Sequence, residues 1–497
     1  MSVAVRGDEK IGEATLQEYL AGFCYDDYYF PMDGAFQNYT YFPRAGLEDV
    51  RSAWKKTASM IRNGKAPAEI GMYVHWPFCI SKCTFCFCSM TVPRSRKEPD
   101  GYLKGLLKEI DAFADIFEGI RFGSLWLGGG TPTFMAAGQL DSLLARIREK
   151  YDFLPGAQIY TESSPATLDE EKVAILAEHG VNRITLGVQS LDAGVLKNVD
   201  RKGQDRSGSE KALDLVRRKG MLVDMDMMFG LEGQSRVSFV RDLVWALKQK
   251  PEVLHVFAFD PKPQTDFIRA GKPLAPEHDG EMAHWMALAD KLIRDSGYRM
   301  SRLDPETLLP DCPEERQDSA LRRDGASVLG LGASAVSHAF GSAWYCHELT
   351  AQRGKNGSGK IPPFRLMKSD LNEEMRGYAL RNLSLYGRLS RPGFVERFGI
   401  DPMEARGLSS GLASLESSEH LRIGQREIVY IGRDPVERGV VLKKLYSPAV
   451  LKAIMKGRKQ DFMRYTREQE GRRGGWPAVI TEKIARRQLF RVYFKNS

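Results

Sequence analysis

Four of the seven cysteines lie within ten residues, at Cys79, Cys83, Cys86 and Cys88. The spacing C-x3-C-x2-C-x-C places several thiolates on one loop, where each can bind a different iron of a cubane iron–sulfur cluster. Ligation by Cys79, Cys83 and Cys86 leaves the fourth iron without a protein sulfur, so that iron can bind a substrate or a cofactor. A tetrahedral zinc site that uses all four cysteines is the alternative. Such sites usually combine one closely spaced pair of cysteines with a second pair far along the chain, and this sequence has no second pair.

The cysteine loop resembles that of a known family. The stretch Tyr-Val-His-Trp-Pro-Phe-Cys-Ile-Ser-Lys-Cys-Thr-Phe-Cys-Phe-Cys over 73–88 is similar to the cluster motif of radical S-adenosylmethionine (SAM) enzymes. In its longer form it resembles oxygen-independent coproporphyrinogen III oxidase. The resemblance implies a [4Fe-4S] cluster whose open iron binds SAM, and a reductive cleavage of SAM to methionine and a 5′-deoxyadenosyl radical. It also implies an electron donor such as flavodoxin or ferredoxin.

Short β-rich runs alternate with amphipathic stretches beyond residue 70. This alternation predicts parallel strands joined by helical crossovers, hence an α/β barrel or an open sheet. The resemblance implies the partial (β/α)6 barrel of radical SAM enzymes, in which chemistry gathers at the carboxyl ends of strands. The expected strands are 71–77, 124–128, 158–162, 183–187, 222–227 and 254–259, and the expected helices lie near 101–118, 136–150, 168–179, 209–219 and 235–249.

Glycine and polar residues stand at the expected ends of these strands. Gly128, Gly129, Gly130 and Thr131 follow the second strand. Glycines let the backbone approach the amino and carboxylate groups of a ligand, although a tight turn explains them equally well. Glu162 ends the third strand, where it can accept hydrogen bonds from ribose hydroxyls or pair with a sulfonium, or simply be a surface acid.

The resemblance also assigns roles to individual residues. Tyr73, Glu162 and Cys88 are the expected catalytic residues. Cys88 is interpreted as a proton or hydrogen relay beside a second SAM, with a spare thiol as the alternative. The expected contacts of the SAM molecules are Tyr73, Phe85, Gly128, Gly129, Gly130, Thr131, Glu162, Gln189, Arg201 and Asp226, together with Ala333 and Val336 in the glycine-containing segment after the barrel.

Some segments depart from the coproporphyrinogen oxidase pattern. Residues 38–45 and 329–337 resemble its pre-barrel and post-barrel motifs, but its Asn-Phe-Gln-Gly-Tyr-Thr-Thr and Met-Asp-His-Phe segments are replaced at 316–327 and 300–303. We therefore expect a two-SAM methyltransferase or cyclopropanase that modifies an sp2 carbon of a small-molecule or peptide substrate. An oxidative decarboxylase of the coproporphyrinogen oxidase type, or another haem-processing enzyme, is the alternative. A haem chaperone is a further alternative, against which Cys88 stands.

Composition is ordinary for a folded protein: 497 residues, 27% charged, with a formal net charge of +8. No apolar run approaches the ~20 residues that a membrane-spanning helix needs. The first residues carry charges where a signal peptide needs an apolar core, so we expect a cytoplasmic protein without a membrane partner.

The chain divides into five expected parts. A helical, winged-helix-like domain at 371–450 should contain helices at 372–384, 391–398, 401–415 and 434–445 and a strand at 426–431. Residues 451–497, which we call the basic tail, contain thirteen Lys or Arg residues and four acidic residues. This tail could bind nucleic acid or a carrier protein, or it could be a solvated helix. The whole protein is expected to be a monomer. The parts are an N-terminal extension that contributes to the active site (1–70), the barrel and post-barrel segment (71–350), a linker (351–370), the helical domain (371–450) and the basic tail (451–497).

Overall fold

The structure is a computed structural model of the chain. It describes residues 42–259, 265–270, 278–301, 307–310, 325–347, 359–432, 438, 441–453 and 456. The first residues of the 38–45 motif, nearly all of 316–327 and the basic tail from 457 onward lie outside these described residues, and so does much of the helix expected at 434–445.

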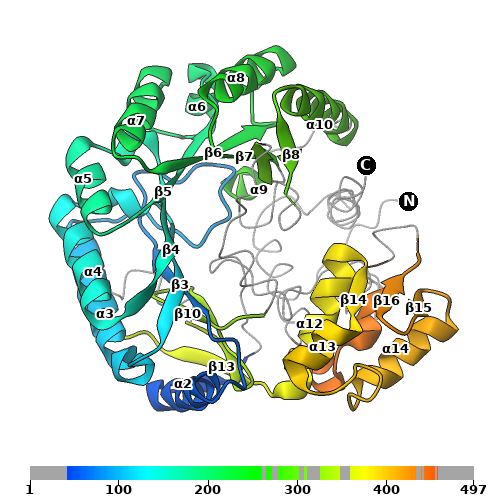
Figure 1. The fold of residues 1–497 in the computed structure, drawn as a ribbon. Coiled ribbons are helices and arrows are strands. Elements are labelled where there is room, and N and C mark those ends of the chain that lie inside the picture. The colour runs from blue at the N-terminus through cyan, green and yellow to red at the C-terminus, as the bar shows by residue number, and fades with distance from the viewer. Residues whose placement is uncertain are drawn as a thin grey trace, which may run out of the picture.

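Six consecutive parallel strands form the centre of a 13-stranded sheet. Each of β2 to β7 pairs with the next strand along the chain, and the helices between them lie on the outside of the curved sheet in Figure 1. This arrangement confirms the expected (β/α)6 barrel. The strands are β2 (Ile70–Trp76), β3 (Arg121–Gly129), β4 (Asp152–Ser163), β5 (Arg183–Gln189), β6 (Leu222–Phe229) and β7 (Val253–Ala258).

The barrel helices bury apolar faces against the sheet. All seven residues of β2 are buried, as expected for a strand that is covered on both faces. Phe113 from a helix and Phe122 from β3 are fully buried in the main core, which joins this helical layer to the strands. The helices of the barrel are α3 (Lys97–Ala114), α4 (Ala137–Lys150), α5 (Glu170–Glu178), α6 (Ala193–Asn198), α7 (Arg206–Arg218) and α8 (Arg236–Gln249).

Further strands extend both edges of the barrel sheet. On one side β10 pairs parallel to β2, and β11, β12, β13 and β1 follow it as antiparallel strands. The post-barrel glycine segment therefore lies beside the strand that leads into the cysteine loop. The additional elements are β1 (Arg44–Ala45), α2 (Leu47–Arg62), α9 (Asp266–Arg269), α10 (His278–Asp295), β8 (Tyr298–Met300), β9 (Thr307–Pro310), β10 (Val328–Leu331), β11 (Val336–Ala339), β12 (Ala343–His347) and β13 (Phe364–Lys368).

The C-terminal elements build a second core around a small antiparallel sheet in the order β14-β16-β15. Asp370 caps the first of their helices by accepting a hydrogen bond from the Glu373 amide, and Gly387 ends it with φ +66°. Trp344 and Cys346 of β12 belong to the same apolar cluster. The elements are α12 (Leu371–Tyr386), β14 (Arg388–Ser390), α13 (Arg391–Phe398), α14 (Leu408–Ser417), β15 (Leu421–Ile423) and β16 (Glu427–Tyr430).

Two expected boundaries were wrong. The helix expected at 401–415 begins only at Leu408, because Asp401 turns back to bind Arg391 and Gly407 takes φ +80° before the helix. The third barrel strand begins at Asp152 rather than 158, because its first residues pair with β3 ahead of an irregularity between Phe122 and Ser124. The division of the chain into five parts stays a prediction.

Candidate active site

The cysteine loop leaves the carboxyl end of β2 and is fixed by backbone hydrogen bonds. The Cys79 amide binds the carbonyl of Thr91 at 3.1 Å, and the Cys86 amide binds that of Cys83 at 3.0 Å. The Thr84 amide reaches the carbonyl of Val199, just after α6, at 3.0 Å. The loop is thus attached to two different parts of the barrel rim, and its cysteines are half-buried.

Burial keeps most of these thiols protonated. It raises the pKa of Cys79 to about 12 and raises that of Cys83 above its ordinary value. A hydrogen bond donated by the Cys88 thiol lowers the pKa of Cys86 to about 7 and raises that of Cys88 well above its ordinary value. Arg201 offers compensating charge, with its Nη1 3.7 Å from Cys83 Sγ.

The four thiols do not converge on one point in the structure. Among the described residues, no group of three or more His, Cys, Asp or Glu side chains is close enough to hold a single metal ion. A cubane cluster makes a different demand, because each thiolate binds a separate iron atom. The assignment of Cys79, Cys83 and Cys86 as cluster ligands stays a prediction.

The glycines after β3 allow three pieces of backbone to meet. The Gly130 amide binds the Trp76 carbonyl at 2.7 Å, and the Gly129 amide donates to Glu162 Oε2 at 3.1 Å. Gly129 has φ +113°, and a Cβ on it would lie 2.6 Å from the ring of His75. Close approach to β2 and β4 therefore requires glycine here, whether or not a ligand also binds.

Thr131 extends this contact to the cysteine loop. Its hydroxyl lies 3.2 Å from the sulfur of Cys79, and its amide binds the carbonyl of Phe78 at 3.0 Å. The segment after β3 thus supports the first of the predicted cluster ligands through both backbone and side chain.

The next strand ends bring more predicted residues to the same edge. Gln189 ends β5 in the left-handed region, with φ +68°, and its buried Oε1 has no hydrogen-bond partner among the described residues. Arg201 donates a hydrogen bond to the Gly187 carbonyl, which ties its guanidinium to β5. Asp226 on β6 lies 2.7 Å from Nδ1 of His255 on β7, a residue that the sequence analysis did not single out.

These features fit the thiolate-bound cluster and the SAM that the resemblance implies. Half-buried thiols beside a guanidinium can become ligands, because a metal replaces their protons and an adjacent cation favours thiolate. A buried amide oxygen without a partner, at Gln189, is the kind of atom that a bound polar ligand satisfies.

Tyr73 and His75 link β2 to the end of the cysteine loop. The Tyr73 hydroxyl donates to His75 Nδ1 at 3.0 Å, and His75 Nε2 donates to the Ser89 carbonyl at 2.8 Å. Burial lowers the pKa of His75 to about 4, so the ring is neutral. A neutral ring has one nitrogen that accepts and one that donates, which matches these two hydrogen bonds. Burial also raises the pKa of Tyr73 well above its ordinary value, so this phenol stays protonated.

Two polar residues of α3 hold the post-barrel glycine segment in place. Glu109 Oε2 accepts from the Gly332 amide at 3.1 Å, and its Oε1 lies 2.6 Å from His347 Nε2. The Tyr102 hydroxyl accepts from the Ala333 amide at 2.9 Å and donates to the His75 carbonyl at 2.7 Å. The predicted second-SAM segment is therefore attached to β2, next to the cysteine loop.

The other predicted residues have apolar surroundings. Phe85 packs against an apolar cluster that includes Val199, Phe259 and Phe267, and Val336 belongs to the core shared with the C-terminal elements. Their roles toward SAM stay predictions.

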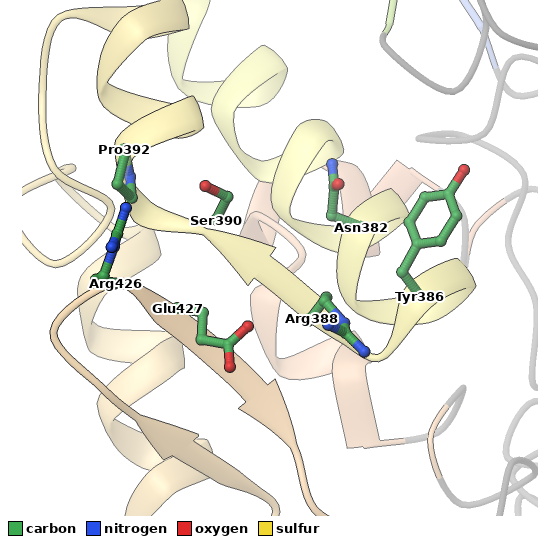
Figure 2. Close-up of a pocket in the computed structure, with 7 residues that line it drawn as sticks. All are labelled: Asn382, Tyr386, Arg388, Ser390, Pro392, Arg426 and Glu427. Atoms are coloured by element: carbon green, nitrogen blue, oxygen red, sulfur yellow. The ribbon is translucent and has the colours of Figure 1, made fainter.

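A separate cleft of about 960 Å³ opens on the C-terminal elements. Figure 2 shows its polar side chains spread over α12, β14 and the start of β16. None of the residues predicted for the cluster or SAM lines it. The lining residues are Asn382, Tyr386, Arg388, Ser390, Pro392, Arg426 and Glu427.

Comparison with known families agrees with the cysteine loop and the barrel. Residues 73–246 match the model of the radical SAM superfamily. These residues therefore form a radical SAM domain. A domain of this kind implies a [4Fe-4S] cluster and SAM as cofactors and a source of electrons, whereas the number of SAM molecules stays a proposal.

Curated relatives narrow the resemblance further. The chain is 26% identical over 363 residues to the oxygen-independent coproporphyrinogen III oxidase of Pseudomonas aeruginosa, covering 68% of this chain and 76% of that protein. It is 31% identical over 290 residues to that of Bradyrhizobium diazoefficiens (55% and 63%). It is also 26% identical over 230 residues to a haem chaperone of Buchnera aphidicola (46% and 60%). The chain thus matches less than two thirds of the length of the last two proteins.

A solved structure shows the same fold. Coproporphyrinogen III oxidase from Escherichia coli superposes with a TM-score of 0.62 and 23% identity, over 78% of this chain and 92% of that chain. Among the described helices, none is long and apolar enough to cross a membrane.

The expected methyl or methylene transfer was wrong. The similar curated proteins are coproporphyrinogen III oxidases and haem chaperones rather than methyltransferases. The expectation rested on altered residues at 300–303 and 316–327, most of which lie outside the described residues. Altered substrate-side segments are compatible with the same family, because one barrel can vary its loops around a constant cofactor site.

Proposed function

We propose that this chain is a radical SAM oxidoreductase that decarboxylates a tetrapyrrole of the coproporphyrinogen type. The observation that carries the proposal is the extent of similarity to the Pseudomonas aeruginosa oxidase, which covers 68% of this chain. The part that matches the superfamily as a whole is limited to residues 73–246. Similarity therefore extends into segments outside the shared cofactor-binding part, where enzymes of one fold usually differ in substrate.

In this proposal Cys79, Cys83 and Cys86 hold the cluster. When bound, the cluster and SAM supply the one-electron chemistry that removes a hydrogen atom from the substrate, and the protein supplies binding and orientation. Arg201, 3.7 Å from Cys83 Sγ, offsets part of the negative charge that three thiolates bring to the loop.

Residues at three strand ends would orient SAM. The Gly129 amide binds one oxygen of Glu162, which fixes this carboxylate at the end of β4, where it can accept hydrogen bonds from ribose hydroxyls. The buried Oε1 of Gln189 would accept a hydrogen bond from SAM, which removes the cost of leaving that oxygen unpaired. Asp226, which lies 2.7 Å from His255 Nδ1, is the third of these polar residues at the strand ends.

We also propose a second SAM at the segment that contains Ala333 and Val336. This segment follows β10, which pairs parallel with β2, so it lies beside the cysteine loop. Tyr102 and Glu109 hold its amides in a defined conformation. Cys88, the predicted relay, would then lie between the cluster and this second molecule.

Anaerobic turnover tests the proposed reaction. The reconstituted full chain would be incubated with coproporphyrinogen III, SAM and dithionite, and the products would be separated by chromatography with mass detection. The proposal predicts substrate-dependent 5′-deoxyadenosine and CO2, with loss of carboxyl groups from the tetrapyrrole and no S-adenosylhomocysteine. Unchanged coproporphyrinogen, with 5′-deoxyadenosine that does not depend on it, would reject decarboxylation of this substrate.

Haem binding is the second candidate function. Its support is the similarity to two proteins named haem chaperones, over 230 residues in each case. A haem titration followed by absorbance distinguishes the two functions. A chaperone binds haem stoichiometrically and leaves coproporphyrinogen III unchanged, whereas the oxidase consumes coproporphyrinogen III.

A further inference from the structure

The outer side of the cysteine loop carries an unusual pair of exposed apolar side chains. Six large hydrophobic residues are exposed among those described, and four of them are scattered singly over the surface, as is normal. The other two, Ile80 and Val92, are 42% and 43% exposed and flank the cysteine loop.

Backbone pairing links the segments that carry these two residues. Phe78 and Thr91 form a parallel bridge, and the Cys79 amide binds the Thr91 carbonyl at 3.1 Å. Ile80 directly follows Cys79 and Val92 directly follows Thr91, so both exposed residues adjoin this backbone contact. Ile80 is also joined directly to Cys79 through the peptide bond, so one of the exposed apolar residues adjoins a predicted cluster ligand.

Cations border this apolar pair on one side. Val92 and Arg94 are two residues apart in non-helical chain, which favours the same face for both, and Arg96 and Lys97 follow at the start of α3. All three cationic side chains are exposed, and no carboxylate of the described residues lies within ion-pair distance of them. We call Ile80, Val92, Arg94, Arg96 and Lys97 the loop patch.

Neighbouring charged side chains do not neutralise the three cations of the loop patch. Lys82 pairs with Asp266 at 2.5 Å, and Lys202 pairs with Asp200 at 3.4 Å, so each of these pairs is neutral. The Ser81 hydroxyl donates to the Asp200 carbonyl, which places the second pair beside the loop.

Two further carboxylates lie in the first turn of α3, on Glu98 and Asp100. Glu98 accepts from the Arg94 backbone amide at 2.9 Å, which leaves the Arg94 guanidinium outside that contact. Asp100 accepts a hydrogen bond from Gln139 Nε2 at 2.6 Å, and the three cations of the loop patch outnumber these two acids.

We propose that the loop patch is the docking surface for the electron donor, and that the donor is a small acidic electron-transfer protein. The inference rests on the proposed cluster site, because an electron must enter through protein surface close to the cluster. A partly apolar centre with a charged border is the usual composition of a protein interface. The positive border selects an acidic partner and speeds its encounter, with an effect that salt weakens.

The test uses a purified acidic bacterial flavodoxin as the probe and the reconstituted full chain. Binding would be measured by surface plasmon resonance at low and high salt, and cluster reduction by the flavodoxin hydroquinone would be followed by stopped-flow absorbance without any tetrapyrrole. The variant is R94E/K97E. A negative residue at Lys97, in the first turn of α3, is compatible with the helix dipole, so folding should persist.

A matched control reverses two exposed cations of α7, in K211E/R218E. The proposal predicts about tenfold weaker flavodoxin binding and slower reduction for R94E/K97E, with the control within about twofold of wild type. Dithionite, a small reductant, should reduce all three proteins equally, which shows that the cluster is intact.

Equal binding and reduction by wild type and R94E/K97E would overturn the proposal. An equal loss in K211E/R218E would overturn it too, because the effect would then come from net charge alone. Both readouts are independent of coproporphyrinogen III, so a failure of the proposed reaction is distinguishable from a failure of the docking surface.

Discussion

At the scale of single residues, Gly129 is the position where an added methyl group should lower the stability of the protein most. An alanine here would need a left-handed conformation and would push its Cβ to 2.6 Å from the His75 ring. We expect Gly129→Ala to lower the free energy of unfolding by roughly 2–4 kcal/mol and to weaken SAM binding.

Gly138 offers the matched control for this substitution. It lies in the first turn of α4, and a Cβ added there meets no atom within 4 Å. Gly138→Ala should leave stability unchanged or raise it by about 0.5–1 kcal/mol. Chemical denaturation of both variants measures the difference, and equal stability of the two would contradict the close approach at Gly129.

His75 predicts how stability depends on pH. Burial lowers its folded-state pKa to about 4, below the ordinary value of about 6.5 in an unfolded chain. The unfolded chain therefore takes up a proton first as the pH falls, and the free energy of unfolding decreases between about pH 6.5 and 4. The loss should be on the order of 3 kcal/mol.

Urea denaturation of the metal-free chain at several pH values tests this. His75→Gln, which cannot titrate, should show a shallower pH dependence in the same window. An unaltered slope in the variant would mean that His75 is not the group responsible.

The candidate site residues that could be predicted from the sequence are those whose types and spacing form a recognisable motif. The cysteine loop, the glycines, Glu162, Gln189, Arg201 and Asp226 were all named, and the structure brings them to one edge of the sheet. His255 and Glu109 were not singled out and His347 was given no role, because none of them belongs to a motif with a recognisable spacing. Their partners are supplied only by folding, which places Glu109 2.6 Å from a residue 238 positions away.

At the scale of elements, Tyr102 of α3 joins the post-barrel glycine segment to β2, the strand that leads into the cysteine loop. Tyr102→Phe removes the acceptor of the Ala333 amide and the donor to the His75 carbonyl. We expect roughly 1–3 kcal/mol of destabilisation from these buried groups. We also expect equilibrium dialysis to find one bound SAM in place of two.

Tyr151 provides a control within the same layer. Its buried hydroxyl donates to the Ile110 carbonyl of α3 at 2.7 Å, and none of the bonds that hold the glycine segment involves it. Tyr151→Phe should lose similar stability but keep two SAM molecules. One SAM in wild type would contradict the second site, and two in Tyr102→Phe would contradict the role of Tyr102.

The elements themselves were largely predictable, because buried parallel strands are apolar and the helices between them are amphipathic. The helices α2, α6 and α10 were not predicted, and of these α6 has only six residues, too few for a helical period to be recognised. The antiparallel strands that widen the sheet were also missed as strands, since β11 and β12 have only four and five residues and little alternation.

At the scale of the whole molecule, a buried ion pair connects the C-terminal elements to the barrel sheet. His338 Nε2 on β11 lies 3.0 Å from Glu374 Oε1 on α12, and the Gly341 amide donates to the same carboxylate at 2.9 Å. Although burial alone would raise the pKa of Glu374, the charge and hydrogen bond of His338 hold that pKa below its usual value. The His338 ring also stacks on Trp344.

Glu374→Gln should therefore destabilise the protein by roughly 1–3 kcal/mol, because it replaces the buried carboxylate that binds both His338 Nε2 and the Gly341 amide. The stabilising contribution of Glu374 should be present at neutral pH and be lost in acid as the carboxylate protonates. Thermal unfolding measures both effects. Glu373→Gln, at the neighbouring half-buried position of the same helix, is the control, and equal melting temperatures for the two variants would contradict the role of the pair.

The most direct test of the account concerns the cluster and its open iron. Reconstituted wild type and the variants Cys79→Ala, Cys83→Ala, Cys86→Ala and Cys88→Ala would be reduced with dithionite and examined by electron paramagnetic resonance with and without SAM. The account predicts a [4Fe-4S] signal that SAM changes in wild type and in Cys88→Ala, and loss of that signal in the other three. Loss of iron from Cys88→Ala to the same degree, or a wild-type signal that SAM leaves unchanged, would contradict it.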